Sequence, residues 1–344
     1  MGFELPVDPR DERRARVSRW VATLLSLAMV GLLAYLAYVG YEGSRQMVEP
    51  EHSQNCRTPQ VYGWAYEAIN YDGSADAALA AEPNPLRCAN QGPPAGDALL
   101  SSDGIHIAGW YVPAGRSLGP TGPTVVVVHG WSSNKSGVLP LAEVLHDDYN
   151  LVLFDLRNHG QSSSAVTTLG VLEQRDLEAV LDWLVATKAP ERIAVMAESM
   201  GGAAAVNEVA KDPRVDALLL DSTHATLSDA IAHRLNRAGY PLSLPGSWAI
   251  LLGGLFRTGV DMTSVDPIHA VDNLGGRPLL IMQGGADTSF DPASGQQLYD
   301  AAVAAGVNAE LQVCPEASHS QLLMTCPDAY RGWVLGFLAR ALGT

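Results

Sequence analysis

Basic residues are scarce in this sequence. Lys and Arg number 22 against 37 Asp and Glu, the formal net charge is −15, and no basic run follows the first twenty residues. Binding to nucleic acid needs clustered Lys and Arg opposite the phosphates, so this composition argues against nucleic acid and against strongly acidic substrates. The sequence also lacks the Gly-x4-Gly-Lys-Ser/Thr phosphate loop, the His-Glu-x-x-His zinc pair and any internal repeat. We therefore predict neither a metal nor a cofactor.

Charge is absent altogether from residues 20–40. This stretch of 21 mostly apolar residues can cross a hydrocarbon core of about 30 Å as a helix. Five arginines precede it, whereas the chain after it carries Glu42, Arg45, Glu49 and Glu51. By the positive-inside rule, we expect residues 1–19 to be cytoplasmic and residues 20–41 to form a transmembrane signal anchor. The chain would then cross the cell membrane once, and the residues after 41 would be extracytoplasmic.

A cleaved signal peptide is the alternative interpretation of this segment. Its apolar region would normally span about 7–15 residues and would be followed by a small-residue cleavage site. Residues 20–40 exceed that length and no clean Ala-x-Ala site follows them, so the uncleaved anchor is favoured.

Cysteine is also scarce, and all four cysteines follow the apolar segment. An extracytoplasmic compartment permits disulfides, and the sequence-local pairing joins Cys56 with Cys88 and Cys314 with Cys326. Each bridge would stabilise the fold by ~2–4 kcal/mol. Four buried free thiols are the alternative, and the spacing contains no Cys-x-x-Cys motif.

Residues 42–96 are rich in Pro, Asn, Gly and Glu. This composition predicts an extracytoplasmic stalk or extension pinned by the first disulfide, with one short helix at 62–69.

From residue 97 to residue 344 the pattern changes to alternating strands and helices, which predicts a single α/β domain with a doubly wound, mostly parallel sheet. A hairpin turning at Asp103-Gly104 leads into it. The expected strands lie at 124–129, 151–155, 193–197, 217–221, 278–283 and 309–314, and the expected helices at 137–146, 169–187, 202–210, 292–305 and 327–342. Reactive side chains in such sheets collect at the carboxyl ends of the strands.

One serine stands at such a strand end. The string Ala197-Glu198-Ser199-Met200-Gly201 lies between a strand and a helix of small residues, which predicts a tight turn that holds Ser199 as a nucleophile. The small residues two before and two after the serine permit the sharp reversal of the chain. An Ala/Gly-rich helix start would give the same letters, so the string alone is ambiguous.

A second polar turn, His129-Gly130-Trp131, follows the apolar strand at 124–129. The backbone N–H groups of Trp131 and Met200 are our candidates for an oxyanion hole, because aimed amides stabilise a tetrahedral intermediate more than the ground-state carbonyl. The side chain of His129 is expected to order this loop rather than to transfer protons.

A third turn reads Asp155-x-Arg157-x-His159-Gly160-x-Ser162. In this order, and each behind a strand, the three strings resemble the α/β-hydrolase superfamily, and within it the serine-hydrolase branch of bem46-like and ABHD-type membrane-anchored esterases. The resemblance extends from about residue 98 to the C-terminus. It implies that the turn at 155–162 is structural.

A serine nucleophile needs a histidine base and an acid, in the chain order Ser, acid, His for this family. The turn after the strand at 278–283 is similar to the family's Gly-x-x-Asp-x-x-Val-Pro pattern and places Asp287 at the acid position. Asp291 competes, but it stands before Pro292 and is expected to cap the next helix. His319 is the one histidine beyond the acid in sequence, and it is our predicted base.

The alternation of strands and helices breaks at 225–266, where the family inserts a cap. Two helices are expected here, at 227–238 and 247–258, and the second carries an apolar stripe: Trp248, Ile250, Leu251, Leu252, Leu255 and Phe256. An apolar cap suggests a lipid-like ester substrate, although the same stripe would also suit packing against the core. Near the site, Glu198 is expected to face solvent or an arginine, and Asp221 to cap a helix or a turn.

The sequence therefore predicts a membrane-anchored serine hydrolase that cleaves carboxylic esters or thioesters through an acyl-enzyme on Ser199. A serine peptidase with the same three residues and a non-catalytic, hydrolase-like binding module are the alternatives. Nothing in the sequence indicates the oligomeric state.

Overall fold

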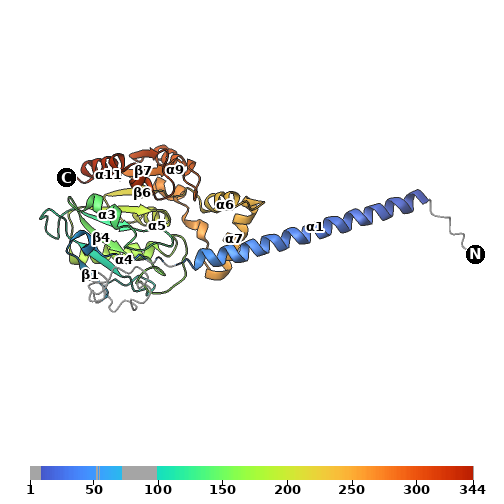
Figure 1. The fold of residues 1–344 in the computed structure, drawn as a ribbon, viewed down its shortest axis with the longest axis horizontal. Coiled ribbons are helices and arrows are strands. Elements are labelled where there is room, and N and C mark those ends of the chain that lie inside the picture. Colours follow the sequence, from blue (N-terminus) through green and yellow to red (C-terminus); the bar gives the residue numbers. More distant parts are fainter. Residues whose placement is uncertain (1–8, 52, 54, 72–98, 344) are drawn as a thin grey trace, which may run out of the picture.

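The computed structural model describes residues 9–51, 53, 55–71 and 99–343. It consists of one globular domain and a single long helix, α1 (Pro9–Val48), which projects from that domain (Figure 1). Cys88 lies outside the described residues, so its pairing with Cys56 stays a prediction.

An eight-stranded sheet forms the centre of the globular domain, in the order β1-β2-β4-β3-β5-β6-β7-β8. The first two strands pair antiparallel with their neighbours, and all the others are parallel. Their bounds are β1 (Glu67–Ile69), β2 (Gly109–Val112), β3 (Thr124–Val128), β4 (Asn150–Phe154), β5 (Ile193–Glu198), β6 (Ala217–Asp221), β7 (Leu279–Gly284) and β8 (Ala309–Cys314). The predicted α/β fold with a mostly parallel sheet is confirmed.

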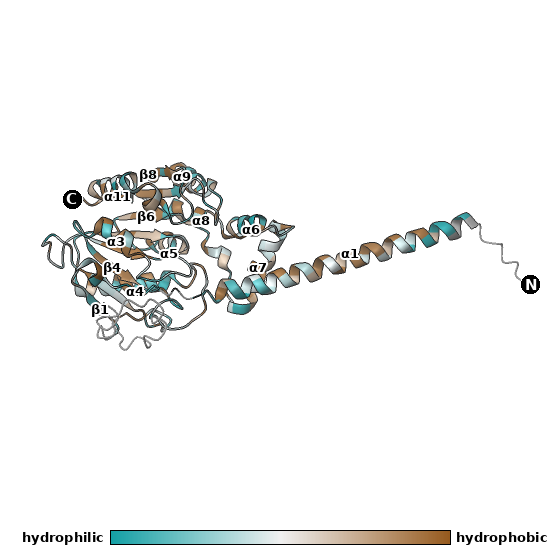
Figure 2. Ribbon diagram, in the orientation of Figure 1, coloured by the Kyte–Doolittle hydropathy of each residue, from teal (hydrophilic) through white to brown (hydrophobic). Residues whose placement is uncertain are grey.

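Helices cover both faces of the sheet because the central strands are apolar on both faces. In β3, Val125 and Val127 belong to one core cluster and Val126 and Val128 to another. The first cluster includes α3 (Leu139–Leu145) and α11 (Pro327–Leu342), and the second includes α4 (Gln174–Thr187), α5 (Met200–Val209) and α9 (Ala293–Ala304). The central strands are therefore buried between two helical layers, and they are among the most apolar parts of the domain (Figure 2).

The predicted helix at 62–69 is wrong. The chain forms a short 3-10 helix, η1 (Pro59–Tyr62), and then the edge strand β1, which pairs antiparallel with β2. Three residues are too few to carry a periodic pattern, so the strand exists because β2 offers it an open edge. The hairpin around Asp103-Gly104 is reduced to a single bridge between Leu100 and His106, and β2 pairs with β1 and β4 instead.

The helix expected at 169–187 begins later, at Gln174. Leu169 and Gly170 have positive φ, which a helix does not tolerate. The carboxylate of Glu173 accepts hydrogen bonds from the N–H groups of Thr168 and Gly170, so the segment before α4 is a tight loop tied to the helix start.

The segment expected to form the cap is helical. It contains α6 (Leu227–Arg237) and α7 (Ser243–Thr258), followed by the short helices η3 (Met262–Val265), α8 (Pro267–Ala270) and η4 (Val271–Leu274) that return the chain to the sheet. Another short helix, α10 (Leu322–Thr325), precedes α11. In Figure 1 the cap stands beside α1 where that helix leaves the globular domain.

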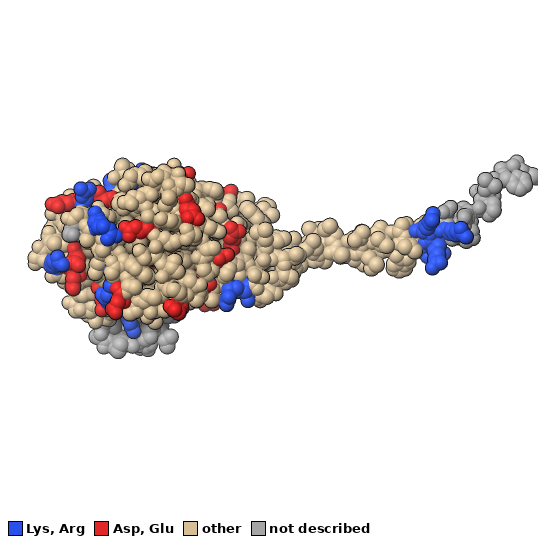
Figure 3. All heavy atoms as spheres, turned by 90° about the horizontal axis from the view of Figure 1, so that it is seen from above, with Lys and Arg blue, Asp and Glu red and all other residues tan. Residues whose placement is uncertain are grey.

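Helix α1 is longer than the predicted anchor. It continues without a break to Val48. Its last turns, with Val39, Met47 and Val48, are buried against the domain. The part of Arg13–Val48 that is apolar enough to cross a membrane is exposed. Figure 3 shows basic side chains at the outer end of this helix, an uncharged shaft, and charges of both signs on the globular domain. The expected stalk at 42–96 is therefore wrong at two places, since its start is helix packed on the cap and Glu67–Ile69 is part of the sheet.

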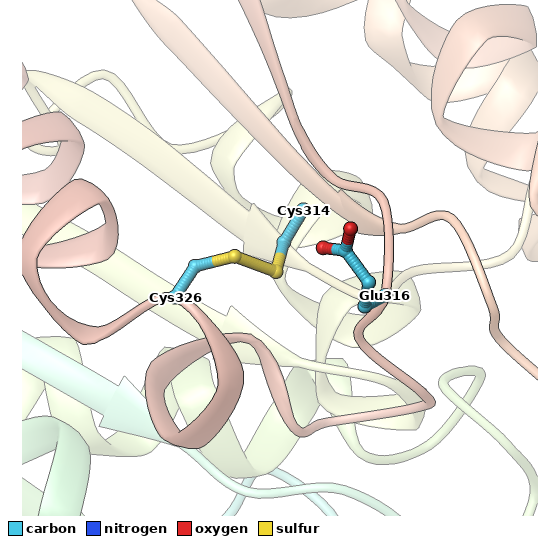
Figure 4. Close-up of side chains that lie close together, drawn as sticks. All are labelled: Cys314, Glu316 and Cys326. Atoms are coloured by element: carbon cyan, nitrogen blue, oxygen red, sulfur yellow. A yellow bond between two sulfur atoms is a disulfide. The ribbon is translucent and has the colours of Figure 1, made fainter.

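The predicted disulfide between Cys314 and Cys326 is present. Figure 4 shows this bridge with the carboxylate of Glu316 beside it. Both sulfurs are joined to each other, so this cluster offers no thiolate ligand for a metal. The bridge closes the loop that carries His319.

Candidate active site

Ser199 occupies a strained turn between β5 and α5. Its backbone has φ 54° and ψ −120°, and its N–H donates to the carbonyl oxygen of Asp221 at 2.9 Å. A non-glycine residue in this region costs of order 1–3 kcal/mol and persists only where the surroundings impose it. A Cβ at Gly201 would lie 2.5 Å from the carbonyl oxygen of His129, so the helix packs against the neighbouring loop only with glycine there. The turn presents the Ser199 hydroxyl at the carboxyl end of the sheet.

The structure brings Ser199, Asp287 and His319 together. His319 Nε2 lies 2.9 Å from Ser199 Oγ, and His319 Nδ1 lies 2.8 Å from Asp287 Oδ2. One neutral tautomer fits both contacts: Nδ1–H donates to the carboxylate, and Nε2 accepts from the hydroxyl. An imidazole held this way is positioned to take the serine proton.

Asp287 is buried and held by three donors besides His319. Its Oδ1 accepts the N–H groups of Ser289 (2.7 Å) and Phe290 (2.9 Å), and its Oδ2 accepts Gln283 Nε2 at 3.2 Å. Burial by itself raises the pKa of Asp287, but the hydrogen bond and charge of His319 and these backbone donors outweigh it and lower the pKa below its usual value. The carboxylate is therefore ionised and can orient the imidazole.

The loop that carries His319 is tied to the strand next to the nucleophile. Ser320 N–H donates to Ser222 Oγ at 3.1 Å, and Ser222 Oγ donates to Asp221 at 2.8 Å. The ring of Phe290 meets the His319 imidazole edge to face, with centroids 4.6 Å apart. Gln283, Ser222 and Phe290 were not predicted from the sequence. Gln283 and Phe290 are within four residues of Asp287, which was the one available signal, whereas Ser222 follows β6 and carries none.

The predicted oxyanion donors flank the serine. Trp131 and Met200 line the same cavity as Ser199. A Cβ at Gly130 would lie 3.0 Å from Ser199 Cβ, so glycine is needed for the loop after β3 to approach the nucleophile. Both residues therefore lie at the cavity that contains the nucleophile, and their role as oxyanion donors stays a prediction.

His129 orders its loop, as expected. The side chain is buried, its Nδ1 lies 2.8 Å from the carbonyl oxygen of Gly130, and its Nε2 accepts the N–H of Leu156 at 3.0 Å. Burial lowers its pKa to about 3, so the ring stays neutral and connects the loops after β3 and β4.

The turn at 155–162 is held by buried ion pairs. Asp155 accepts from the backbone N–H of Lys135 at 2.7 Å and pairs with its ammonium group, while Arg157 pairs with Asp176 and Asp103 at 2.7 Å each. None of these five side chains lines the cavity at Ser199, which agrees with a structural role for the turn.

Two expectations next to the nucleophile are wrong. Asp221 caps neither a helix nor a turn, because its side chain is buried and accepts Tyr330 Oη at 2.7 Å, which ties α11 to β6. Glu198 is half-buried and forms no ion pair with an arginine in the described part of the chain; its carboxylate is hydrogen-bonded to Ser320 and lies near His319. Burial, followed by repulsion from Asp221, raises the pKa of Glu198 to about 7. Asp291 does cap the helix after it, since its Oδ1 accepts the N–H of Ala293 at 2.9 Å.

A cavity of about 630 Å³ opens over Ser199 and His319. Its far wall comes from the cap and from the last turns of α1, and its lining there is mostly apolar: Tyr38, Val39, Gly43, Met47, Leu227, Ile231, Leu235 and Ile250. Trp131 Nε1 donates to the carbonyl oxygen of Met47 at 3.1 Å and closes the seam between α1 and the domain. A cavity of this size and lining suits a small or medium apolar ligand.

Comparison with known proteins places this arrangement in a broad family. A family model described as the α/β hydrolase fold matches residues 123–262. The uncharacterized protein YfhR of Escherichia coli is 27% identical over 254 residues, which cover 71% of this chain and 80% of YfhR. The pimeloyl-[acyl-carrier protein] methyl ester esterase of Xylella fastidiosa is 30% identical over 99 residues, 29% of this chain and 36% of that enzyme.

A solved structure of the Pyrococcus furiosus esterase Pf2001 superimposes with a TM-score of 0.65 at 23% identity, covering 86% of this chain and 98% of that one. At this identity the likeness shows the fold. The strand order, the strained serine turn and the family match agree with one another. The chain has the α/β-hydrolase fold.

Proposed function

We propose that this protein is a membrane-anchored serine hydrolase that cleaves carboxylic esters or thioesters. The observation that carries the proposal is the position of His319, which lies within hydrogen-bond distance of both Ser199 Oγ and Asp287 Oδ2. A hydroxyl is a weak nucleophile at neutral pH, and this pair of contacts supplies both the base and the group that orients it.

The reaction would pass through an acyl-enzyme. Ser199 Oγ attacks the carbonyl carbon and its proton moves to His319 Nε2, while Asp287 stabilises the resulting imidazolium. The N–H groups of Trp131 and Met200 stabilise the negative oxygen of the tetrahedral intermediate. His319 then protonates the departing alcohol or thiol as its bond to carbon breaks. A water molecule then attacks the acyl carbon while His319 Nε2 takes its proton. His319 passes that proton to Ser199 Oγ as the bond between Oγ and the acyl carbon breaks, and the acid leaves.

The lining of the cavity favours an ester over a peptide substrate. Most side chains of the wall opposite Ser199 are apolar, with Glu42, Gln46 and Arg234 among them, and this wall suits an acyl chain. The names of the Pyrococcus and Xylella relatives, both esterases, support the same choice.

Membrane attachment rests on α1. Its apolar stretch is long enough to span a bilayer and is exposed, and arginines cluster on one side of it. By the positive-inside rule, the N-terminus would be cytoplasmic and the catalytic domain extracytoplasmic. Protease added to intact cells would then digest the catalytic domain, whereas digestion only after lysis would contradict this topology.

Active-site labelling tests the catalytic proposal. The oxidised full chain should react with a fluorophosphonate probe and hydrolyse a p-nitrophenyl ester, and Ser199→Ala should abolish labelling and lower kcat at least about 10⁴-fold. Ser264→Ala is the matched control, because that serine is exposed on η3. Absence of labelling in the folded wild-type protein would favour a binding module, and labelling with turnover of peptides but not esters would favour a peptidase.

A further inference from the structure

The cap ends in an exposed apolar surface. We define the cap tip as residues 239–256, which contain no charged side chain. Seven of its large apolar side chains are exposed: Tyr240, Leu242, Leu244, Trp248, Leu252, Leu255 and Phe256, the last of them by 81%. Contiguous apolar surface of this kind marks a site of contact with a protein or a membrane.

The cap tip runs beside the predicted membrane span. Tyr35 Oη donates to the carbonyl oxygen of Pro241 at 2.6 Å, and Arg257, just after the tip, donates to Ser44 Oγ at 2.9 Å and to the carbonyl oxygen of Tyr41 at 3.1 Å. Helices α1 and α7 therefore lie side by side and point the same way (Figure 1). The outermost part of the cap reaches the level of Tyr35, which is inside residues 20–41.

Glycines hold the two helices in close contact. A Cβ at Gly40 would lie 2.7 Å from the carbonyl oxygen of Ala249, and a Cβ at Gly253 would lie 2.6 Å from the carbonyl oxygen of Gly40. Small residues that let backbones approach are characteristic of helix pairs in membranes. The cap tip therefore keeps a fixed depth relative to α1.

That depth can be read from the helix rise. Tyr35 precedes Tyr41 by six residues, or about 9 Å along the axis, so a span that ends at Tyr41 places Pro241 about 9 Å inside the apolar layer. Interfacial helices bury their apolar face to a depth of about 5–10 Å. The first charged residues of α1 and α7 beyond the apolar layer then lie at the same depth. Arg257 Cζ of α7 is 4.6 Å from the centre of the Tyr41 ring, and Glu42 and Arg45 of α1 follow Tyr41.

The cavity connects this level with the catalytic residues. It is lined by Ser199 and His319 at one end, and by Tyr38 of α1 and Tyr240 of the cap tip at the other. A substrate whose acyl chain lies in the leaflet could enter along α1 without crossing water.

We infer that the cap tip inserts into the leaflet on the side of the globular domain, and that the substrate is a long-chain lipid ester taken laterally from that leaflet. The occupant of the exposed surface is lipid, because the surface is continuous with the apolar shaft of α1 and shares its charge boundary. The choice of substrate rests on the proposed hydrolase function. The insertion of the cap tip rests only on its position beside α1.

Tryptophan quenching tests the insertion independently of activity. The full chain is reconstituted into phosphatidylcholine vesicles with or without bromine on the acyl chains, and Trp248→Phe is compared with wild type. Trp20 of the span is present in both proteins, so the difference between their fluorescence reports on Trp248. We expect brominated lipid to quench that difference. Equal fluorescence from Trp248 in both lipids would overturn the insertion.

Activity on two substrates tests the lipid ester. The variant Leu244→Asp/Phe256→Asp should lower the ratio of turnover of a long-chain diacylglycerol in vesicles to turnover of soluble p-nitrophenyl butyrate at least about tenfold, because aspartate is costly in the apolar layer. The control Val303→Asp, on exposed α9, should keep the wild-type ratio. An unchanged ratio in the double variant, with butyrate still hydrolysed, would overturn the inference alone, whereas wild type inactive on both esters would overturn the proposed function.

Discussion

Two walls enclose the cavity, and different forces build them. The sheet wall consists of the loops after β3, β5, β7 and β8, and hydrogen bonds of 2.7–3.2 Å hold its Asp287 and His319. The cap wall consists of α6, α7 and the last turns of α1, and it is assembled by apolar contact and by close packing at glycines. Under the proposed function, this difference predicts that bond cleavage depends on the sheet wall, whereas access and choice of substrate depend on the cap wall.

Replacing the carboxylate of Asp287 in the sheet wall should have the largest effect on kcat. Asp287→Asn keeps the shape of the side chain but removes the charge that orients His319, so kcat for a soluble ester should fall about 10³–10⁴-fold with KM little changed. The measurement is steady-state kinetics together with the melting temperature. Asp291→Asn is the control, because that residue caps α9 outside the cavity. A loss of less than tenfold would show that Asp287 is not the acid.

A larger side chain at the contact between α1 and α7 should instead change KM for a long-chain ester and leave kcat for a short ester nearly unchanged. A leucine at Gly253 would collide with the backbone of Gly40 and with Ser44, which costs about 1–3 kcal/mol and shifts α7 away from α1. We expect Gly253→Leu to raise KM for a long-chain ester severalfold while kcat for a short ester changes little. Gly332→Leu on α11 is the matched control, since open space surrounds that glycine. An equal loss on both esters would remove the distinction between the walls.

The smallest effect concerns the pH dependence of stability. Burial, followed by repulsion from Asp221, raises the pKa of Glu198 from 4.5 to about 7, so the folded protein binds this proton more tightly than the unfolded chain does. Its contribution to stability is complete below pH 4.5 and is lost as the pH rises through about 7. Glu198→Gln should therefore make the fall in melting temperature between these pH values shallower. Exposed Glu191→Gln should leave it as in wild type; an unchanged slope in Glu198→Gln would contradict the raised pKa.

Strong periodic patterns were the most predictable part of the fold. The bounds of β6, β8 and α11 agree with those predicted. An apolar run marks β6, alternation of apolar and polar residues marks β8, and Pro327 marks the start of α11. The order Ser199, Asp287, His319 was also readable, since each follows a strand whose carboxyl end must meet the same edge of the sheet. Their catalytic roles stay predictions.

Short segments and buried acids were not predictable. Glu67–Ile69 is a strand only because β2 has an edge to pair with, so its own letters carry no signal. The surroundings of Glu198 and Asp221 come from Ser320 and Tyr330, which are more than a hundred positions away in sequence. The contact of Gly40 in α1 with Gly253 in α7 was not predicted either. Its one signal in the sequence is the presence of small residues inside two apolar helices.

The sequence by itself determined the mostly parallel α/β fold and placed Ser199, Asp287 and His319 behind strands, because periodicity and local turn chemistry depend on neighbouring residues. Only the tertiary structure decided that the end of α1 forms part of the cavity and that the cap tip lies beside the predicted span. That arrangement depends on shape complementarity between helices about 200 residues apart in the chain, which no local pattern encodes.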